Sequence, residues 1–213
     1  MWLLNDSFTG YLEKRLAQEL PGEKAQYKMA PLGRKTQVQI KYNRIKAKQS
    51  AVSIILFEEK ELAIPLILRQ KYKGVHSNQV SLPGGKQEAC ENLYETSLRE
   101  TEEELGVGQD KLELIGKLSP LYIPPSNFWV QPFVYFSNKQ MNFIPEEKEV
   151  KEIFTFPVSK LLDSGTKSVQ EVRTSQGFNT NTPGYSHNNK YIWGATAMIL
   201  SELEHIILDY QQL

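Results

Sequence analysis

Residues 85–107 constrain the fold more than any other part of the chain, and they read GKQEACENLYETSLRETEEELGV. The second half of this segment predicts a helix on which Glu100, Glu103 and Glu104 share one face, because residues three and four positions apart are neighbours on a helix. The opposite face carries side chains that can pack on a core, namely Tyr94, Leu98, Thr101 and Leu105. The segment therefore predicts a row of carboxylates on a helix that is anchored by its other face.

The row of carboxylates needs a positive partner, since like charges one turn apart destabilise a helix by roughly a few tenths of a kcal/mol. Mg²⁺ and Mn²⁺ prefer oxygen ligands, and proteins commonly bind them through carboxylates together with water and phosphate oxygens. The row therefore predicts metal-dependent phosphate chemistry. The alternative is a solvated helix face on which Arg99 pairs with Glu103. The glycine pair Gly84–Gly85 just before the helix favours the first interpretation.

Residues 85–107 resemble the Nudix box, in which a glycine is followed by five residues, a glutamate, seven residues and the pattern R-E-U-x-E-E-x-G-U, where U is apolar. Every charged and glycine position of this pattern is present, at Gly85, Glu91, Arg99, Glu100, Glu103, Glu104 and Gly106. One position departs, because Thr101 stands where the pattern has its first apolar residue. The resemblance implies an enzyme that hydrolyses a diphosphate linkage with Mg²⁺ or Mn²⁺.

The resemblance also implies roles for individual residues of the box. The expected metal ligands are Gly85, through its carbonyl, and the glutamates Glu100, Glu103 and Glu104. The expected catalytic set is Glu100, Glu103 and Arg99, with Glu100 as the general base and Arg99 orienting the glutamates. In some members of the family a loop glutamate is the base instead, and four are available here, at Glu146, Glu147, Glu149 and Glu152.

The sequence before the box is similar to the signature of coenzyme A pyrophosphatases of bacterial type, roughly L-L-T-x-R-S, a short basic spacer and H-x-G-Q-V-x-F-P-G-G. The matching positions are Arg69, His76, Gln79, Val80, Pro83, Gly84 and Gly85. The departures are Ile67 for threonine, Gln70 for serine, Asn78 for glycine, Leu82 for phenylalanine and a spacer at residues 71–75 without the Leu-Arg pair. The resemblance implies that coenzyme A (CoA) or acyl-CoA is cleaved to 4'-phosphopantetheine, or its acyl form, and adenosine 3',5'-bisphosphate.

Three positions of this signature are expected to bind substrate, namely Arg69, His76 and Gln79. Arg69 ends an apolar segment and is a candidate clamp for the diphosphate, because its planar guanidinium matches two phosphate oxygens. The alternative for Arg69 is a structural ion pair at the end of a strand.

A basic flank is the other candidate for substrate binding. Residues 24–57 contain eight Lys or Arg and no Asp or Glu. Such a flank attracts phosphate groups, so Arg34 and Arg44 are further expected contacts to substrate. A solvated surface that balances the acidic box is the alternative. Three aromatic residues can stack on adenine, although core packing is the favoured interpretation for each: Trp129, Tyr191 and Trp193.

Other substrates and other classes of function stay open. Tyr122, Pro124 and Pro125 lie near positions where other Nudix subfamilies carry cues for dinucleoside polyphosphates or ADP-ribose. ADP-ribose or another nucleoside diphosphate derivative is therefore the alternative substrate. A non-catalytic Nudix domain that senses a ligand is the alternative of a different class, and the intact glutamates argue against it.

Composition sets the remaining expectations. The chain has 213 residues, 40% of them apolar, which is enough for one domain over residues 1–213 with an N-terminal extension at 1–49. Zero net charge without a basic tail disfavours nucleic acid as a partner. The sequence has neither a membrane-spanning run nor a signal-peptide pattern, and its single cysteine, Cys90, cannot form an internal disulfide. We expect a cytoplasmic protein with a small-molecule partner, and the sequence leaves a homodimer open.

The pattern along the chain predicts a mixed α/β fold. An amphipathic helix is expected from Phe8 to Leu20, and a short strand at 191–196 is expected to lead into a C-terminal helix. Further strands are expected at residues 37–42, 51–57, 62–69, 112–118, 128–136 and 152–156. The segment 164–189 is rich in Ser, Thr, Asn and Gly, and it is expected to be a mobile loop. The Nudix resemblance implies that these elements form an α/β/α sandwich with a mixed sheet.

Overall fold

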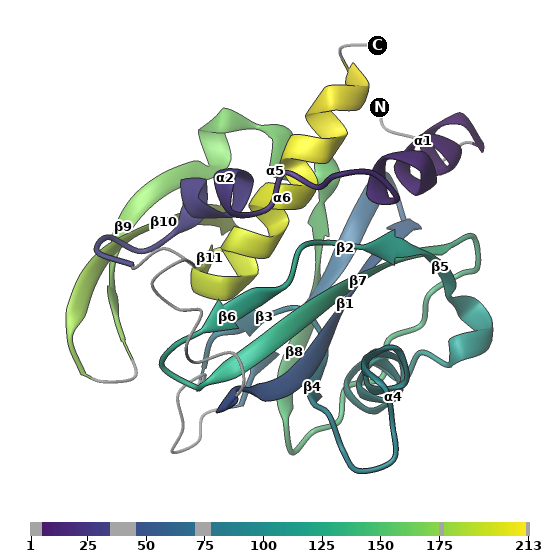
Figure 1. Ribbon diagram of the computed structural model, residues 1–213, viewed down its shortest axis with the longest axis horizontal. Helices are drawn as coiled ribbons and strands as arrows, with labels where there is room; N and C mark the ends of the chain where they lie inside the picture. The colour runs from purple at the N-terminus through teal and green to yellow at the C-terminus, as the bar shows by residue number, and fades with distance from the viewer. Residues whose placement is uncertain (1–5, 35–45, 71–77, 175–176, 212–213) are drawn as a thin grey trace.

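The computed structural model describes residues 6–34, 46–70, 78–174 and 177–211 (Figure 1). The helices are α1 (Asp6–Leu16), α2 (Glu23–Gln26), α4 (Leu93–Leu105), α5 (Val158–Leu162) and α6 (Gly194–Gln211), with 3₁₀ turns η1 (Tyr27–Met29), η3 (Gln109–Lys111) and η4 (Ser164–Thr166). The larger sheet contains β1 (Lys48–Glu58), β2 (Leu62–Arg69), β3 (Val80–Ser81), β4 (Gly84–Lys86), β5 (Glu113–Lys117), β6 (Leu121–Ile123), β7 (Phe128–Ser137) and β8 (Val150–Pro157). The smaller sheet contains β9 (Lys167–Arg173), β10 (Asn179–His187) and β11 (Lys190–Trp193).

The centre of the larger sheet is formed by β1 and β7, which run parallel with Lys48 opposite Phe128 and Phe57 opposite Ser137. Antiparallel neighbours flank this pair, since β2 pairs with β1 and β5 pairs with β7. The strands β3 and β8 pair with β2, while the short strands β4 and β6 pair with β1 and β7. The sheet is therefore mixed, as the sequence predicts.

The side chains of β1 contribute to cores on both faces of the sheet. Ile54 and Leu56 belong to a large core that also contains side chains of α1 and α6. Ile55 belongs to a second core that contains Leu98 and Leu105 of α4, because successive residues of a strand point to opposite faces. Figure 1 shows α4 on one side of the sheet and α6 with α1 on the other. The α/β/α sandwich with a helical N-terminal segment is thus confirmed.

A buried carboxylate fastens the N-terminal segment to the C-terminal helix. Glu202 of α6 is fully buried and accepts hydrogen bonds from the backbone N–H of Gly22 at 2.9 Å and the side-chain amide of Gln26 at 2.9 Å. It also accepts a bond from the N–H of Ser119 at 3.2 Å, just before β6. One acidic side chain therefore joins three segments that are far apart in the sequence.

The expectation of a mobile loop at residues 164–189 is wrong, because most of this segment forms the antiparallel hairpin β9–β10. The hairpin is anchored on α6 by Glu204, which accepts a hydrogen bond from the hydroxyl of Tyr185 at 2.8 Å and pairs with the ammonium group of Lys167. Tyr185 is fully buried. The polar composition of this segment therefore reflects side chains that are exposed to solvent. It does not indicate that strands are absent.

The other expected elements agree with the structure where it describes them. The N-terminal helix forms but ends at Leu16, and β11 leads directly into α6. The strand expected at 37–42 lies outside the described residues. Within the described part of the chain, no helix has the length and apolar character needed to cross a membrane.

Candidate active site

The start and end of α4 are fixed by side-chain and backbone capping. The Oδ1 atom of Asn92 accepts hydrogen bonds from the N–H groups of Tyr94 at 2.9 Å and Glu95 at 3.0 Å. The carboxylate of Glu95 in turn accepts a bond from the N–H of Asn92 at 2.7 Å, which completes a capping box. The helix ends at Gly106, whose φ of 68° is the left-handed conformation that glycine adopts without strain. These caps set which residues of α4 face the sheet.

The buried face of α4 carries hydroxyl groups as well as apolar side chains. Thr101 is fully buried, and its Oγ1 atom lies 2.8 Å from the Oγ atom of Ser53 on β1. Ser97, also fully buried, shares a hydrogen bond of 2.5 Å with the hydroxyl of Tyr135 on β7. Thr101 thus bonds to a hydroxyl group of the sheet, and Ser53 itself donates a hydrogen bond to the carbonyl of Ser97 at 3.1 Å.

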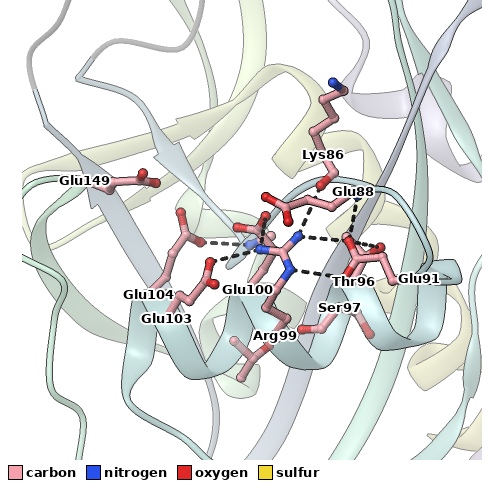
Figure 2. A network of polar contacts seen from close by, with 12 residues as sticks. Lys86, Glu88, Glu91, Thr96, Ser97, Arg99, Glu100, Glu103, Glu104 and Glu149 are labelled. Carbon is pink, nitrogen blue, oxygen red and sulfur yellow. Dashed lines mark hydrogen bonds and ion pairs between the residues drawn. The ribbon is translucent and has the colours of Figure 1, made fainter.

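Arg99 lies at the centre of a network of carboxylates on the other face of the helix (Figure 2). Its Nη1 atom donates to Glu100 and to Glu103, both at 2.9 Å. Its Nε and Nη2 atoms donate to the two oxygens of Glu91 at 3.1 and 3.0 Å, and Nη2 also donates to the carbonyl of Lys86 at 3.2 Å. These bonds lower the pKa of Glu91 to about 2. The contacts are those of an arginine that orients the glutamates, while its part in catalysis stays a prediction.

Glu104 points to a different partner. It is 1% exposed, and its two oxygens accept hydrogen bonds from the guanidinium of Arg69 at 2.9 Å and from the N–H of Gly84 at 2.8 Å. Burial raises the pKa of Glu104 to about 7, although Arg69 opposes the shift. Burial also raises the pKa of Glu100, against the effect of Arg99.

The glycine pair before the box brings the backbone of β4 close to the carboxylates. A Cβ atom on Gly85 would lie 2.3 Å from an oxygen of Glu100, and one on Gly84 would lie 2.3 Å from the carbonyl oxygen of Ala51 on β1. A side chain at either position would therefore displace the Glu100 carboxylate or break the pairing of β4 with β1. These two close approaches explain why glycine occupies both positions.

A cavity of about 1110 Å³ adjoins β4 and extends to the smaller sheet. Among the residues expected to bind substrate, Arg69, Gln79 and Arg34 line this cavity, together with Gly84 and Gly85. The other two, His76 and Arg44, lie outside the described residues. Most of the remaining lining is apolar or carries a hydroxyl group. The cavity is therefore the candidate substrate site beside the carboxylate network.

The profile of the NUDIX domain matches residues 47–174. The chain belongs to the Nudix hydrolase family. Nudix hydrolase 3 of Caenorhabditis elegans is 31% identical over 142 residues, which cover 60% of this chain and 59% of that protein. An uncharacterized Nudix hydrolase NudL of Yersinia pestis is 29% identical over 157 residues, which cover 73% of this chain and 78% of that one.

Solved structures show the same fold. A MutT/nudix family protein from Enterococcus faecalis aligns with a TM-score of 0.54 at 18% identity, over 98% of this chain and 76% of that one. The Nudix hydrolase RenU from M. smegmatis aligns with a TM-score of 0.52 at 12% identity, over 76% of this chain and 87% of that one. At these identities the likeness concerns the fold alone.

The donor set of the Nudix box fits a hard divalent cation. Carboxylates outnumber arginines in the network, with Glu91, Glu100, Glu103, Glu104 and Glu149 set against Arg69 and Arg99. Burial is the main cause of the raised pKa values of Glu100 and Glu104, and the neighbouring carboxylates add to it. Among the described residues, no three acidic, histidine or cysteine side chains are arranged as a metal site, and the carboxylates are bonded to Arg69 and Arg99 instead. Oxygen ligands and excess negative charge are what Mg²⁺ or Mn²⁺ requires.

Arg69 contacts two glutamates and also lines the cavity. Both observations concern its predicted role. It forms the 2.9 Å ion pair with Glu104 and lies 3.7 Å from Glu149 on the loop before β8. This geometry matches the structural ion pair that the sequence left as an alternative. The residue also lines the cavity, so the diphosphate clamp stays a prediction.

The loop glutamates differ in what they contact. Glu149 points toward the carboxylate network in Figure 2, whereas Glu152 pairs with Lys190 at 2.8 Å. Glu146 accepts a hydrogen bond from the N–H of Lys148 at 3.3 Å. Of these three, Glu149 is therefore the one that lies beside Arg69 and the network, and its role as the alternative base stays a prediction.

One departure from the CoA signature has a backbone explanation. Asn78 stands where the signature has glycine, and its φ is 56°. This left-handed conformation favours glycine, and asparagine adopts it more readily than most other residues. The substitution thus preserves the turn that leads into Gln79 and β3.

Some residues of the basic flank and some of the aromatic candidates line the cavity, and others make contacts elsewhere. Arg34 lines it and donates a hydrogen bond of 2.5 Å to the carbonyl of Tyr122, while Lys48 lies 5.6 Å from the ring of Phe128. Among the three aromatic candidates, Trp193 lines the cavity, whereas the hydroxyl of Tyr191 donates to backbone carbonyls of the hairpin.

The cavity residues that sequence reasoning missed include Lys86, Leu32 and Phe178. Lys86 stands at a position of the box that the family pattern leaves unspecified. Leu32 and Phe178 lie in segments without a motif. No sequence signal identifies Leu32 or Phe178, because only the tertiary fold brings their segments to one cavity.

Proposed function

We propose that this Nudix hydrolase cleaves the diphosphate linkage of CoA or acyl-CoA in the presence of Mg²⁺ or Mn²⁺. The observation that carries the proposal is the single cavity that contains Arg69 and Gln79 of the CoA signature and the Gly84–Gly85 edge of the box. Its volume of about 1110 Å³ lies just above the usual range for small-molecule sites, which suits a long substrate. The left-handed backbone at Asn78 supports the match to the signature.

Glu100, Glu103, Glu104 and the carbonyl of Gly85 are the proposed metal ligands. When bound, the cation supplies charge neutralisation for the diphosphate and polarises the attacking water. The chain itself positions these groups: Arg99 holds Glu100 and Glu103, while the N–H of Gly84 holds Glu104.

In the proposed reaction the oxygen of a water molecule bonds to one phosphorus atom, and the bond from that phosphorus to the bridging oxygen breaks. Glu100 accepts the proton of the water as the general base. Glu149 is the second candidate for this step. Arg69 and Lys86 line the cavity next to β4, so their charges stabilise the phosphate groups of substrate and product.

ADP-ribose or another nucleoside diphosphate derivative is the second candidate substrate. One observation favours it: Tyr122, Pro124 and Pro125, which lie near positions where other Nudix subfamilies carry cues for these substrates, also line the cavity. A ligand-sensing domain without activity is disfavoured by the complete network around Arg99.

The test is a substrate panel. The protein is incubated with CoA, an acyl-CoA, ADP-ribose, NADH and diadenosine polyphosphates, each with Mg²⁺ or Mn²⁺ and each with EDTA as the control. Products are identified by mass. Adenosine 3',5'-bisphosphate from CoA, formed only with metal and faster than any product from the other compounds, supports the proposal. Preferential cleavage of ADP-ribose or of a dinucleoside polyphosphate contradicts it.

A further inference from the structure

Much of the cavity is built by parts of the chain outside the residues that match the Nudix domain. Residues 31–34 precede the matched range, while Phe178, Thr180 and the β11–α6 junction follow it. The two outer parts are neighbours in space, because η1 packs against β10. The shape of this end of the cavity is therefore a property of this chain rather than of the shared domain.

Two large apolar side chains stand at the open edge of this end. Leu32 and Phe178 line the cavity, yet 72% of Leu32 and 69% of Phe178 remain exposed to solvent. A side chain that lines a cavity and is also mostly exposed lies at its mouth. We call this pair the apolar lip. Single exposed apolar residues are common on protein surfaces, so what distinguishes this pair is that both residues line the cavity that also contains the Gly84–Gly85 edge.

The charged side chains of the described cavity lining are all cations. Arg69 and Lys86 lie beside Gly84 and Gly85, where the diphosphate is expected, and Arg34 lies two positions from Leu32 with its guanidinium bonded to the carbonyl of Tyr122. The two members of the apolar lip carry no charge. An occupant with phosphate groups near these cations and an uncharged apolar group at the mouth is complementary to this arrangement.

We propose that the apolar lip, Leu32 and Phe178, binds the acyl group of an acyl-CoA and makes the enzyme prefer apolar thioesters to free CoA. This inference rests on the proposed function and names the substrate class within it. An aliphatic chain suits both members of the lip, whereas a nucleobase could stack on Phe178 but not on Leu32. A mouth position also lets chains of different length extend into solvent. The thioester bond takes no part in the reaction.

The experiment compares kcat/KM for free CoA, acetyl-CoA and octanoyl-CoA in wild-type protein and in Phe178→Ala and Leu32→Ala. Val169→Ala is the matched control, since Val169 lies in the same hairpin and is 64% exposed but does not line the cavity. Burying one methylene group of the substrate raises kcat/KM by up to about fourfold. In wild-type protein, kcat/KM for octanoyl-CoA should therefore exceed kcat/KM for CoA by at least about tenfold. Both lip variants should reduce this ratio of octanoyl-CoA to CoA by about threefold or more, while the control variant should leave the ratio unchanged.

Binding without turnover supplies a second measurement. In EDTA, calorimetric titration should give tighter binding of octanoyl-CoA than of CoA, and Phe178→Ala should remove that difference. Equal loss for CoA and octanoyl-CoA in the variants would mean that the lip binds a part common to both, such as the adenine, and overturns the inference. CoA hydrolysis with no dependence on acyl length overturns it as well and leaves the proposed function standing. Cleavage of ADP-ribose but of neither CoA nor any thioester overturns both.

Discussion

The carboxylate network and the substrate cavity are built in opposite ways. The partners of Arg99 lie between residues 86 and 103, so this part of the network is assembled within one turn and one helix, and Arg69 of β2 adds the longer-range contacts to Glu104 and Glu149. The cavity draws its lining from residues 31 to 199, through nearly every layer of the fold. The chemistry therefore depends on local sequence, whereas the choice of substrate depends on how distant segments pack.

Substitutions in the two regions should therefore have different effects on activity. A substitution in the network alters several charged contacts at once, because Arg99 joins three carboxylates. A substitution at the mouth of the cavity alters a single exposed side chain. Variants of the network should therefore lose activity on all substrates, and variants of the cavity should change the ranking of substrates.

The largest expected effect tests the network. Glu103→Gln should lower kcat by about 100- to 1,000-fold without unfolding the protein, the range typical of removing one group that stabilises the transition state. Glu102→Gln is the control, because Glu102 is an exposed glutamate on the same helix. Steady-state kinetics in Mg²⁺ and in Mn²⁺ provide the measurement, with thermal melting as the check on folding. Near-normal turnover of Glu103→Gln would remove Glu103 from the expected metal ligands.

Arg69 joins the two regions, since it contacts Glu104 of the network and lines the cavity. If it clamps the diphosphate through two parallel hydrogen bonds, Arg69→Lys should lower kcat/KM by about 1.5 to 3 kcal/mol, or about 10- to 150-fold. A lysine retains the positive charge opposite Glu104, so the melting temperature should barely change.

The two roles of Arg69 are separated by measuring both quantities on the same variant. A lower melting temperature together with normal kinetics of the folded fraction would assign Arg69 to the structural ion pair. Glu149→Gln is the companion variant, because it removes the 3.7 Å neighbour of Arg69 without touching the buried pair with Glu104.

The part of the network around Arg99 could be predicted from the sequence because its determinants are local. The spacing of Glu100, Glu103 and Glu104 placed them on α4, and Asn92 and Gly106 set the ends of that helix through contacts with near neighbours. It did not predict that Glu104 turns inward to Arg69, because this pairing spans 35 positions and depends on how β2 meets α4.

The hairpin shows the limit of composition as a guide. Residues 164–189 are polar because most of their side chains are exposed, yet the buried contacts of Tyr185 and Lys167 with Glu204 hold them as strands. These contacts join β9 and β10 to α6, so they depend on a pairing that no local pattern reveals. The same holds for Leu32 and Phe178 at the mouth of the cavity.

A smaller effect tests how far the network also stabilises the fold. The hydrogen bonds from Arg99 lower the pKa of Glu91 to about 2, below the ordinary glutamate value of 4.5. A lowered pKa in the folded state stabilises the protein above about pH 4.5, and this contribution is lost as the pH falls toward 2. Glu91→Gln should therefore lower the free energy of unfolding by about 1 kcal/mol at pH 7 and by progressively less below pH 4.5. Urea unfolding at both pH values measures this, and an equal loss at pH 7 and pH 2.5 would contradict it.

The smallest expected effect concerns the basic flank, where long-range attraction rather than contact should dominate. If the basic flank attracts the 3'-phosphate of CoA, the KM of dephospho-CoA should be a few-fold higher than that of CoA at low salt. This difference in KM should shrink as the ionic strength rises. Arg34 lines the cavity, so Arg34→Gln should narrow the difference, whereas Lys24→Gln should not, because Lys24 is exposed and does not line it. Equal KM values for CoA and dephospho-CoA at low salt would show that the flank is a solvated surface. In that case specificity would reside in the apolar part of the cavity, which sharpens the contrast between the two regions.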